Sequence, residues 1–328
     1  MKQQITTPLW KNIQRQSFTD WEALADFLYL DNIQRKSILQ HPSFPLLLPR
    51  RLAGKISKNT LNDPILRQFL PRIEETTSSE GFCQDPADEL PSQITTRLLQ
   101  KYENRALLLC TKACAMHCRY CFRKHLHTNN NDKDLYEELA FITANTSLKE
   151  IILSGGDPLS LSDDKLQALL ENLAKIPHIR RIRFHTRFPI GIPERLDHHF
   201  LAVLKNTPLQ LWFVLHINHP KELDDDIVAA LSKVHAMGIP LLNQAVLLRK
   251  VNDDAKTLIE LNETLINAKI IPYYLHQLDR VEGAAHFEVD RTKGQQLLSK
   301  ISRQLPGYAI PKYVEEISGQ PYKTLVGI

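Results

Sequence analysis

Apolar runs as long as buried strands alternate with amphipathic helical patterns from about residue 104 to residue 304. The predicted strands are 106–110, 150–154, 181–185, 211–217, 241–248 and 271–278. The predicted helices are 135–145, 164–175, 194–205, 223–237, 254–268 and 294–304. Buried strands separated by helices of this length are typical of right-handed βα units and a parallel sheet. The pattern therefore predicts an α/β protein.

Six βα units are two short of a closed eight-stranded barrel, so a partial, open (β/α)6 barrel fits the count better than a doubly wound sheet. Periodicity alone does not separate the two architectures. No glycine-rich dinucleotide-binding motif follows any predicted strand, which argues against the doubly wound alternative. In parallel barrels the active site lies at the C-terminal ends of the strands, and polar residues and glycines gather there in this chain.

The first hundred residues lack this rhythm and instead show short helical patterns interrupted by prolines. In one of them, at 20–30, Trp21, Leu24 and Phe27 recur at helical spacing. We therefore expect a mostly helical N-terminal region (1–100), a partial barrel (101–305) and a short C-terminal segment (306–328).

Composition narrows the class of protein without naming a function. The 328 residues are 43% hydrophobic and 24% charged, which is ordinary for a globular protein and excludes disordered and disulfide-rich classes. A formal net charge of +4 is too small to argue for a nucleic-acid-binding surface. No apolar run approaches the ~18 residues of a membrane span, and the polar N-terminus leads to no signal-peptide core. We expect a cytoplasmic protein with neither nucleic acid nor membrane as a partner.

Four of the five cysteines fall within twelve residues, from Cys110 to Cys121. An odd number of cysteines crowded into one loop makes a poor disulfide framework, and clustered reduced thiols suggest metal or cluster ligands. Cys110 lies on the preceding predicted strand, and Cys83 stands alone. We expect these two to be small buried apolar residues.

The remaining three, Cys114, Cys118 and Cys121, have the spacing C-x3-C-x2-C with Tyr120 before the last. A structural zinc site needs four ligands, and a histidine or Cys110 would have to supply the fourth (His117 and His125 are the candidates). Three thiolates on a [4Fe–4S] cluster instead leave one iron open. The spacing resembles the signature of radical S-adenosylmethionine (radical SAM) enzymes, whose open iron binds the methionine part of SAM. A zinc-binding scaffold is the alternative from a different class.

Further segments extend this resemblance. Gly155, Gly156 and Asp157 resemble the motif that holds the methionine amino group, and His216 matches a position near SAM. Longer stretches, at 105–110, 121–123, 243–249, 273–279 and 307–311, are similar to lysine 2,3-aminomutases. The similarity runs from about residue 85 to the C-terminus.

Lysine 2,3-aminomutases also use pyridoxal 5′-phosphate (PLP), which a lysine amine binds. The resemblance places this role on Lys323, with Lys312 as the nearest rival, although the family's glycine run before the lysine is reduced here to Gly319. Arg105 and Gln244 match positions near the cofactor phosphate.

The same resemblance assigns the substrate contacts. Arg123 matches the arginine that pairs with the substrate carboxylate, and guanidinium geometry suits a bidentate pair. Asp279 and Glu316 match two acidic positions that bind the distal ammonium of lysine. Glu316 stands where clostridial-type enzymes carry an aspartate.

These matches imply an isomerase, an L-lysine 2,3-aminomutase that converts L-α-lysine into β-lysine. The implied mechanism uses a 5′-deoxyadenosyl radical and a PLP imine, with an external electron donor. The chain has no cysteine after Cys121, which favours the short branch of the family that supplies (R)-β-lysine to elongation factor P and its β-lysine ligase. The alternatives are a catabolic enzyme that gives (S)-β-lysine and another radical SAM enzyme.

Overall fold

The computed structural model describes residues 7–125 and 135–327. All strands in this part of the chain form one sheet, in which they follow their order in the sequence. The central strands pair in parallel: β3 (Arg105–Thr111), β4 (Glu150–Gly155), β5 (Arg181–Thr186), β6 (Gln210–Leu215), β7 (Leu241–Val246), β8 (Ile271–His276) and β9 (Lys312–Glu315).

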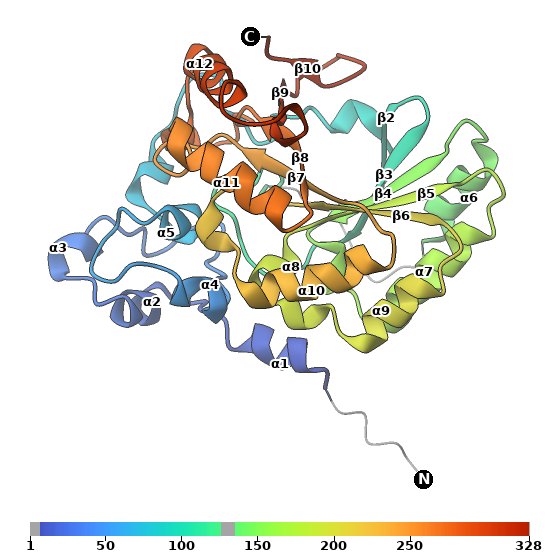
Figure 1. Cartoon of the computed structure of the whole chain (residues 1–328), viewed down its shortest axis with the longest axis horizontal. Coiled ribbons are helices and arrows are strands. Elements are labelled where there is room, and N and C mark those ends of the chain that lie inside the picture. The colour runs from blue at the N-terminus through green and yellow to red at the C-terminus, as the bar shows by residue number, and fades with distance from the viewer. Residues whose placement is uncertain (1–6, 126–134, 328) are drawn as a thin grey trace.

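A helix connects each parallel strand to the next and lies outside the curved sheet (Figure 1). These helices are α6 (Tyr136–Ala144), α7 (Asp163–Ala174), α9 (His198–Lys205), α10 (Asp225–Ala236), α11 (Ala255–Asn267) and α12 (Arg291–Ser302). The short α8 (Phe188–Gly191) follows β5. Six helical crossovers between parallel strands confirm the predicted partial (β/α)6 barrel. The strands and helices predicted between residues 104 and 304 lie within a few residues of the observed ones, and β9 is a seventh parallel strand that the prediction did not include.

Three short antiparallel strands extend the sheet at its two edges. β1 (Gln93–Thr95) and β2 (Leu98–Tyr102) lie beyond β3, and β10 (Thr324–Leu325) pairs with β9. The hydrophobic pattern did not predict them, because strands of two to five residues show too little alternation. The sheet therefore includes residues from all three regions expected from the sequence.

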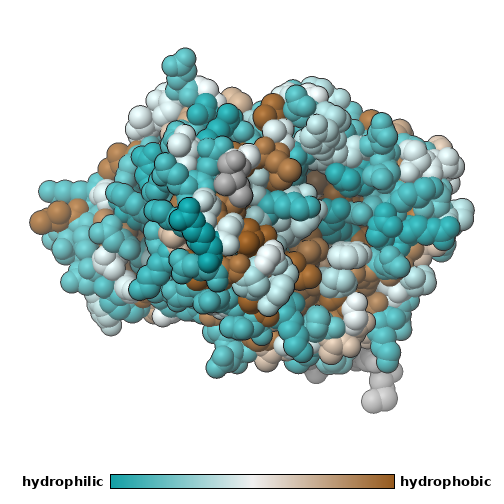
Figure 2. Space-filling view, turned by 45° about the horizontal axis from the view of Figure 1, so that its top comes forward, coloured by the Kyte–Doolittle hydropathy of each residue, from teal (hydrophilic) through white to brown (hydrophobic). Residues whose placement is uncertain are grey.

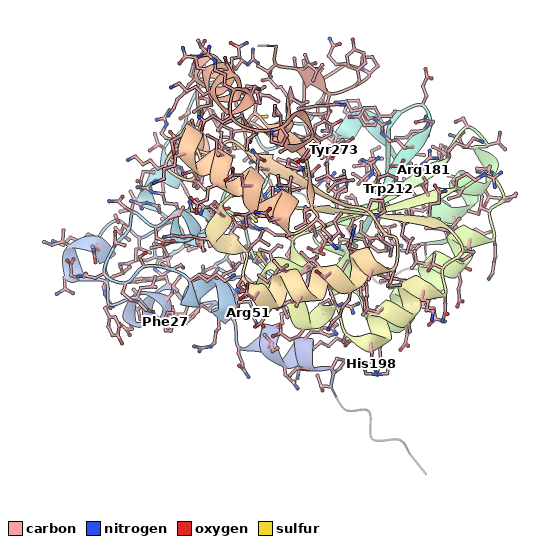
Figure 3. The ribbon with its side chains drawn as sticks, in the orientation of Figure 1. Phe27, Arg51, Arg181, His198, Trp212 and Tyr273 are labelled. Atoms are coloured by element: carbon pink, nitrogen blue, oxygen red, sulfur yellow. The ribbon has the colours of Figure 1, made fainter. Side chains whose placement is uncertain are left out.

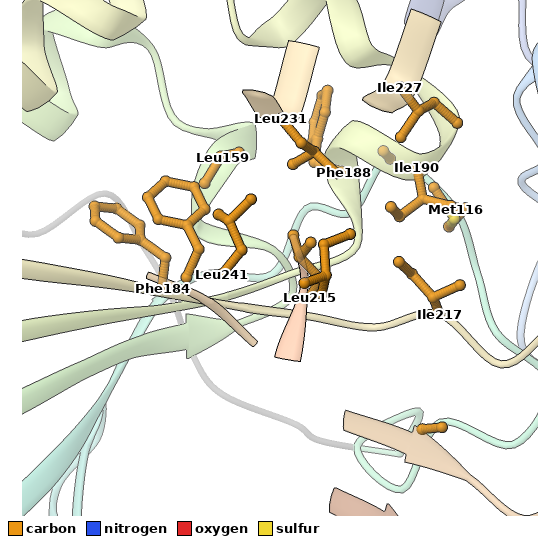
Figure 4. Packing of buried hydrophobic residues seen from close by; sticks show 14 of the residues in the cluster. Met116, Leu159, Phe184, Phe188, Ile190, Leu215, Ile217, Ile227, Leu231 and Leu241 are labelled. Carbon is orange, nitrogen blue, oxygen red and sulfur yellow. The ribbon is translucent and has the colours of Figure 1, made fainter. Parts of the chain in front are cut away.

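The two faces of the sheet have different surroundings. Along β5, Ile182 and Phe184 are buried, while the alternating Arg183 and His185 are only partly buried. The buried face packs against the helices (Figure 4). Phe184 stacks on Phe213 of β6 with ring centroids 4.8 Å apart, and Phe200 of α9 meets Phe213 edge-on. The other face is left for the cavity described below.

The N-terminal helices pack beside the barrel, at the lower left of Figure 1. They are α1 (Leu9–Arg15), α2 (Trp21–Phe27), α3 (Asn32–Arg35), α4 (Arg50–Gly54) and α5 (Pro64–Phe69). Asp20 caps α2 by accepting a hydrogen bond from the Ala23 amide. Arg51 of α4, labelled in Figure 3, pairs with Asp224 and Asp226 at the start of α10. This ion pairing fastens the N-terminal region to the barrel.

Short 3₁₀ turns complete the described chain: η1 (Ile73–Thr76), η2 (Leu90–Ser92), η3 (Pro158–Ser160), η4 (Pro193–Arg195), η5 (Pro220–Glu222), η6 (Ala285–Phe287) and η7 (Gly307–Ala309). Within residues 7–125 and 135–327, no helix has the length and apolar character required to cross a membrane.

The aromatic contact between β5, β6 and α9 generates a stability prediction. Phe213→Ala removes a fully buried ring and leaves a cavity against two aromatic neighbours, so the free energy of unfolding should fall by about 3–5 kcal/mol. Urea denaturation followed by circular dichroism measures this. Tyr308→Ala, at a side chain that is 71% exposed, is the control and should change stability little. Equal losses in both variants would contradict the packing described here.

Candidate active site

The site residues expected from the sequence line one cavity of about 430 Å³. They are Arg105, Cys114, Cys118, Cys121, Arg123, Gly155, Gly156, Asp157, His216, Gln244, Asp279, Glu316 and Lys323. Apolar side chains such as Leu99, Ile152 and Val214 contribute to the same lining. When the top of Figure 1 is turned forward, hydrophobic residues gather near the centre of this face within a hydrophilic surround (Figure 2).

The cavity extends along the strands as well as over their C-terminal ends. Arg105 begins β3 and the cysteine loop follows its end at Thr111, so about 20 Å of strand separates them at ~3.3 Å per residue. In closed eight-stranded barrels, layers of side chains fill the interior. The open sheet leaves part of this space free as a cavity.

The N-terminal region holds the cysteine loop in place through backbone groups. The Gln14 side chain donates to the Cys114 carbonyl oxygen at 3.1 Å. The amides of His117 and Arg119 donate to the carbonyls of Leu47 and Gln68, each at 2.9 Å. A loop without regular secondary structure needs such partners for its buried backbone groups.

A buried ion pair adds a side-chain anchor to the same loop. The Arg119 guanidinium binds both oxygens of Glu75, at 2.9 Å from Nε and 2.5 Å from Nη2, and donates to the Phe44 carbonyl at 2.6 Å. The pair is almost fully shielded from solvent. Arg119 lies between Cys118 and Cys121 in the sequence, so this ion pair holds that part of the loop against the N-terminal region.

The three cysteines of the loop fit a cluster better than a single ion. Burial, together with the neighbouring Cys118, raises the pKa of Cys121 to about 11. The part of the chain that the structure describes contains no group of three His, Cys, Asp or Glu side chains that could hold one metal ion. A [4Fe–4S] cluster makes a different demand, because each thiolate binds a separate iron.

Two of the three candidate fourth zinc ligands, His117 and Cys110, have other surroundings. The Nδ1 atom of His117 lies 2.9 Å from the Pro45 carbonyl oxygen, and its ring stacks on Phe44. Cys110 is buried on β3, as expected, and burial raises its pKa to about 12. The expectation for Cys83 was wrong: it is exposed, on a loop whose backbone pairs with the segment around Val281.

Gly155 and Gly156 allow the chain before the cysteine loop to approach the end of β4. Gly155 has φ +116°, and a Cβ there would lie 2.5 Å from the Thr111 carbonyl oxygen. A Cβ on Gly156 would lie 2.3 Å from the Ala113 oxygen. Only glycine fits at either position, so the motif is required to bring this turn against the loop.

The Asp157 carboxylate is occupied by the protein itself. It accepts hydrogen bonds from the Thr186 hydroxyl and from the backbone amides of Leu159, Arg187 and Phe188, at 2.7–3.0 Å. The side chain therefore shapes the turn between β4 and β5. The resemblance implies that the backbone and the acidic side chain of this motif together hold the methionine amino group, and the backbone of the motif is the part not engaged in these hydrogen bonds.

Arg123 is a buried cation with one side of its guanidinium already paired. Glu89 accepts from Nε at 2.9 Å and from Nη2 at 2.5 Å, and the Ser154 hydroxyl accepts from Nη1 at 3.0 Å. Nη1 and Nη2 each carry a second N–H that these bonds do not use, so the edge that they form can pair with a second carboxylate. Glu89 and Ser154 thus orient the guanidinium while leaving its binding edge open.

The acidic end of the cavity contains Glu316, Asp279 and the candidate cofactor lysine. Glu316 accepts from Lys323 at 2.6 Å and also pairs with Lys101 of β2. Burial raises the pKa of Asp279 to about 7, with Lys323 lowering it and Glu316 raising it. Lys323 and both acidic residues therefore lie within electrostatic reach of one another.

The remaining expected residues lie along the inner strands. The Arg105 guanidinium lies 3.9 Å from the centre of the Tyr102 ring. His216 Nε2 lies 2.8 Å from the Tyr120 hydroxyl, and burial together with Arg187 lowers the His216 pKa to about 3. His216 is therefore neutral at physiological pH.

Sequence reasoning missed several residues that complete the site. Glu89 and Lys101 orient Arg123 and Glu316, yet no local motif marks them. Arg187 and Glu222 form a buried ion pair beside Cys118. The only available signal was the position of Arg187 at the end of a predicted strand.

Comparison with known proteins supports the interpretation of the cysteine loop as part of a radical SAM site. Residues 108–261 match the model of the radical SAM superfamily. An L-lysine 2,3-aminomutase of Haemophilus influenzae is 39% identical, over 96% of this chain and 95% of the relative. One of Escherichia coli is 43% identical, over 86% of this chain and 83% of the relative. One of Clostridium subterminale is 29% identical, over 97% of this chain and 80% of the relative.

Radical SAM enzymes use a [4Fe–4S] cluster and S-adenosylmethionine, and lysine 2,3-aminomutases add PLP. The cavity offers three thiols, a glycine turn beside them and a lysine amine, which fit these groups. With this identity over nearly its whole length, the chain belongs to the L-lysine 2,3-aminomutase family of radical SAM isomerases.

Proposed function

We propose that the protein is an L-lysine 2,3-aminomutase that converts L-α-lysine into β-lysine. The observation that carries the proposal is that one cavity combines a buried arginine, two acidic side chains and a lysine amine with the three cysteines. An α-amino acid with a distal ammonium has the complementary charges. Two carboxylates near the distal group favour a cationic side chain and disfavour an acidic one.

Each bound group has residues that would hold it. Cys114, Cys118 and Cys121 would bind the cluster, and Lys323 would bind PLP. When bound, the cluster and SAM would supply the radical that removes a hydrogen atom from the substrate. PLP would supply the ring that stabilises the substrate radical while the amino nitrogen moves from Cα to Cβ. The backbone at Gly155, with the rest of its turn, would hold SAM.

The carboxylate end of the substrate would bind Arg123. The edge of the guanidinium formed by Nη1 and Nη2 can make a bidentate pair, while Glu89 keeps the opposite edge fixed. The Ser154 hydroxyl further limits rotation of the side chain. A fixed guanidinium would place the substrate Cα and Cβ in one position relative to the cysteine loop.

The distal ammonium would bind Asp279 and Glu316. Lys101 and Lys323 both pair with Glu316 and keep its carboxylate in the cavity wall. Lys323 would leave this carboxylate if its amine bound PLP, and the distal ammonium of the substrate would then be a cationic partner for Glu316. Asp279 becomes fully ionised in the presence of this ammonium, since an opposite charge favours the charged form.

The other residues would position the cofactors. Arg105 and Gln244 would face the PLP phosphate, and His216 would contact SAM as a neutral hydrogen-bonding group. Apolar side chains in the lining (Leu99, Leu107, Ile152, Val214 and Val246) would keep water and competing hydrogen donors away from the reacting atoms.

The proposal extends to physiological purpose. The product would be (R)-β-lysine, which a separate ligase attaches to elongation factor P, and an external donor would reduce the cluster. Support comes from the lack of any cysteine after Cys121, because the stand-alone lysine aminomutases carry further metal-binding cysteines there. The reduced thiols that a cluster needs suit a cytoplasmic protein.

The decisive experiment is an anaerobic incubation of reconstituted protein with L-lysine, SAM, PLP and a reductant, followed by chiral chromatography. We expect (R)-β-lysine that depends on all three added cofactors. A pure (S)-β-lysine product would assign the protein to lysine catabolism. The absence of any β-lysine from protein that carries its full iron would remove the lysine assignment.

Replacement of one cluster cysteine tests the metal site. Cys118→Ala should abolish bound iron and the brown colour after anaerobic reconstitution, because two thiolates cannot hold the cluster stably. Iron and sulfide analysis measures this. Cys83→Ala, at an exposed thiol outside the cavity, is the matched control and should keep both. Full iron content in Cys118→Ala would contradict the assignment.

Chemical trapping tests the cofactor lysine. Borohydride reduction of PLP-loaded protein should leave a pyridoxyl label on the peptide that contains Lys323, since only this lysine of the C-terminal segment lines the cavity. Peptide mass spectrometry locates the label. Lys312→Ala, at an exposed position of β9, should label normally. A label on Lys312 in wild-type protein would show that the assignment is wrong.

The Asp279 carboxyl gives both a mutational and a pH prediction. Asp279→Asn removes a charged partner of the ammonium, typically worth ~1.5–3 kcal/mol, so kcat/KM for lysine should fall roughly ten- to hundred-fold. In wild-type protein the raised pKa of about 7 means that the carboxylate is lost as pH falls through 7. The KM for lysine should therefore rise below pH 7.

The variant should lose this pH dependence, because its amide does not titrate. Steady-state kinetics between pH 6 and pH 8 measures both effects. Glu282→Gln, at an exposed acid three residues further along, should behave as wild type. A KM that is flat across this range in wild-type protein would contradict the role of Asp279.

A further inference from the structure

A buried arginine of the cavity wall, to which no role has been assigned so far, donates to one of the cluster cysteines. Arg187 directly follows β5, and its side chain is only 6% exposed. Its Nη1 atom lies 2.9 Å from Cys118 Sγ and 2.5 Å from the Tyr120 hydroxyl. A full positive charge therefore lies in hydrogen-bond contact with a thiol that would bind the cluster.

The other half of the guanidinium is held by two further residues. Nη2 donates to Gln68 Oε1 at 2.7 Å and to Glu222 Oε2 at 2.8 Å. The Phe69 ring lies 4.8 Å from the guanidinium carbon. These contacts fix the orientation of the guanidinium group. The direction of the hydrogen bond from Nη1 to Cys118 Sγ is therefore set by the fold.

The partners of Arg187 are themselves fixed. Glu222 is completely buried, and its Oε1 accepts from Gln68 Nε2 and from the amides of Asn218 and His219, at 3.0–3.1 Å. Asn218 also donates to the Tyr120 hydroxyl at 2.6 Å. The network thus connects α5, the loop after β6 and the cysteine loop.

Stability alone is a weak explanation for this arrangement. A buried ion pair loses hydration energy, and apolar residues of similar volume are often as stable or more stable in its place. The position of the pair against Cys118 offers a functional reason. Hydrogen bonds to the sulfurs of an iron–sulfur cluster, together with nearby charge, are principal determinants of its reduction potential.

We propose that Arg187 is a positioning residue that holds the Cys118 thiolate and makes the bound cluster easier to reduce. Its positive charge stabilises the reduced cluster, which carries one more electron, relative to the oxidised one. Glu222 and Gln68 keep the guanidinium aimed at the sulfur. This inference rests on the cluster site of the proposed function, and it does not depend on which substrate the enzyme uses.

The test is a redox titration of the reconstituted cluster, followed by electron paramagnetic resonance, with iron content as a second readout. Arg187→Gln removes the charge, and the ratio of reduced to oxidised cluster at the wild-type midpoint should fall about tenfold. For a one-electron couple this corresponds to a midpoint ~59 mV lower. Arg187→Lys keeps a positive charge but loses the guanidinium geometry. Its midpoint potential should therefore lie between those of the wild type and Arg187→Gln.

The control is Arg195→Gln, which removes another fully buried arginine. Arg195 pairs with Asp163 at 2.7 Å and donates to the Leu159 carbonyl, so its loss reproduces the damage to packing. Its midpoint should equal that of wild type. An equal shift in Arg195→Gln would overturn the proposal by showing that any buried arginine has this effect.

A wild-type midpoint in Arg187→Gln with full iron would also overturn it. If Arg187→Gln retains no iron, Arg187→Lys decides the matter: a lowered midpoint supports the proposal and a wild-type midpoint overturns it. Wild-type protein that binds no iron would refute the cluster site and this inference together. An unchanged midpoint in iron-loaded variants would refute this inference alone and leave the proposed lysine activity in place.

Discussion

The ion pairs that Glu316 makes with Lys101 and Lys323 join parts of a sheet that backbone hydrogen bonds leave open. Lys101 belongs to β2, near one edge of the sheet, and Glu316 directly follows β9, near the other. Six βα units do not close a barrel, so side chains bridge the seam. The candidate cofactor lysine lies at this seam, at the wall of the space that the open sheet encloses.

Several of the charged side chains that line this space form ion pairs, because an unpaired buried charge is costly. Arg123 has Glu89, Glu316 has two lysines, and Arg187 has Glu222. A ligand that enters must therefore replace a partner or use an edge that the pair leaves open. This condition favours a molecule that carries both an anion and a cation and disfavours molecules with only one of them.

The N-terminal helices contribute to the chemistry without containing any of the assigned ligands. The loop that carries the three cysteines lies outside the helices and strands, so its backbone lacks their regular hydrogen bonds. Gln14, Leu47 and Gln68 supply hydrogen-bond partners for this backbone instead. Arg119 adds a buried pair with Glu75. The irregular first hundred residues act as the support against which the cysteine loop is ordered.

The sequence by itself determined those features that depend on residues close together in the chain. Hydrophobic periodicity predicted the six βα units, and the short spacings of Cys114 to Cys121 and of Gly155 to Asp157 pointed to the cluster chemistry. Tertiary structure alone decided which distant side chains complete the site. Lys101 and Glu316 are 215 residues apart, and Arg187 and Glu222 are 35 apart. No periodic pattern in the sequence predicts such pairs. Their contact forms only when the strands assemble and the curvature of the sheet brings their ends together.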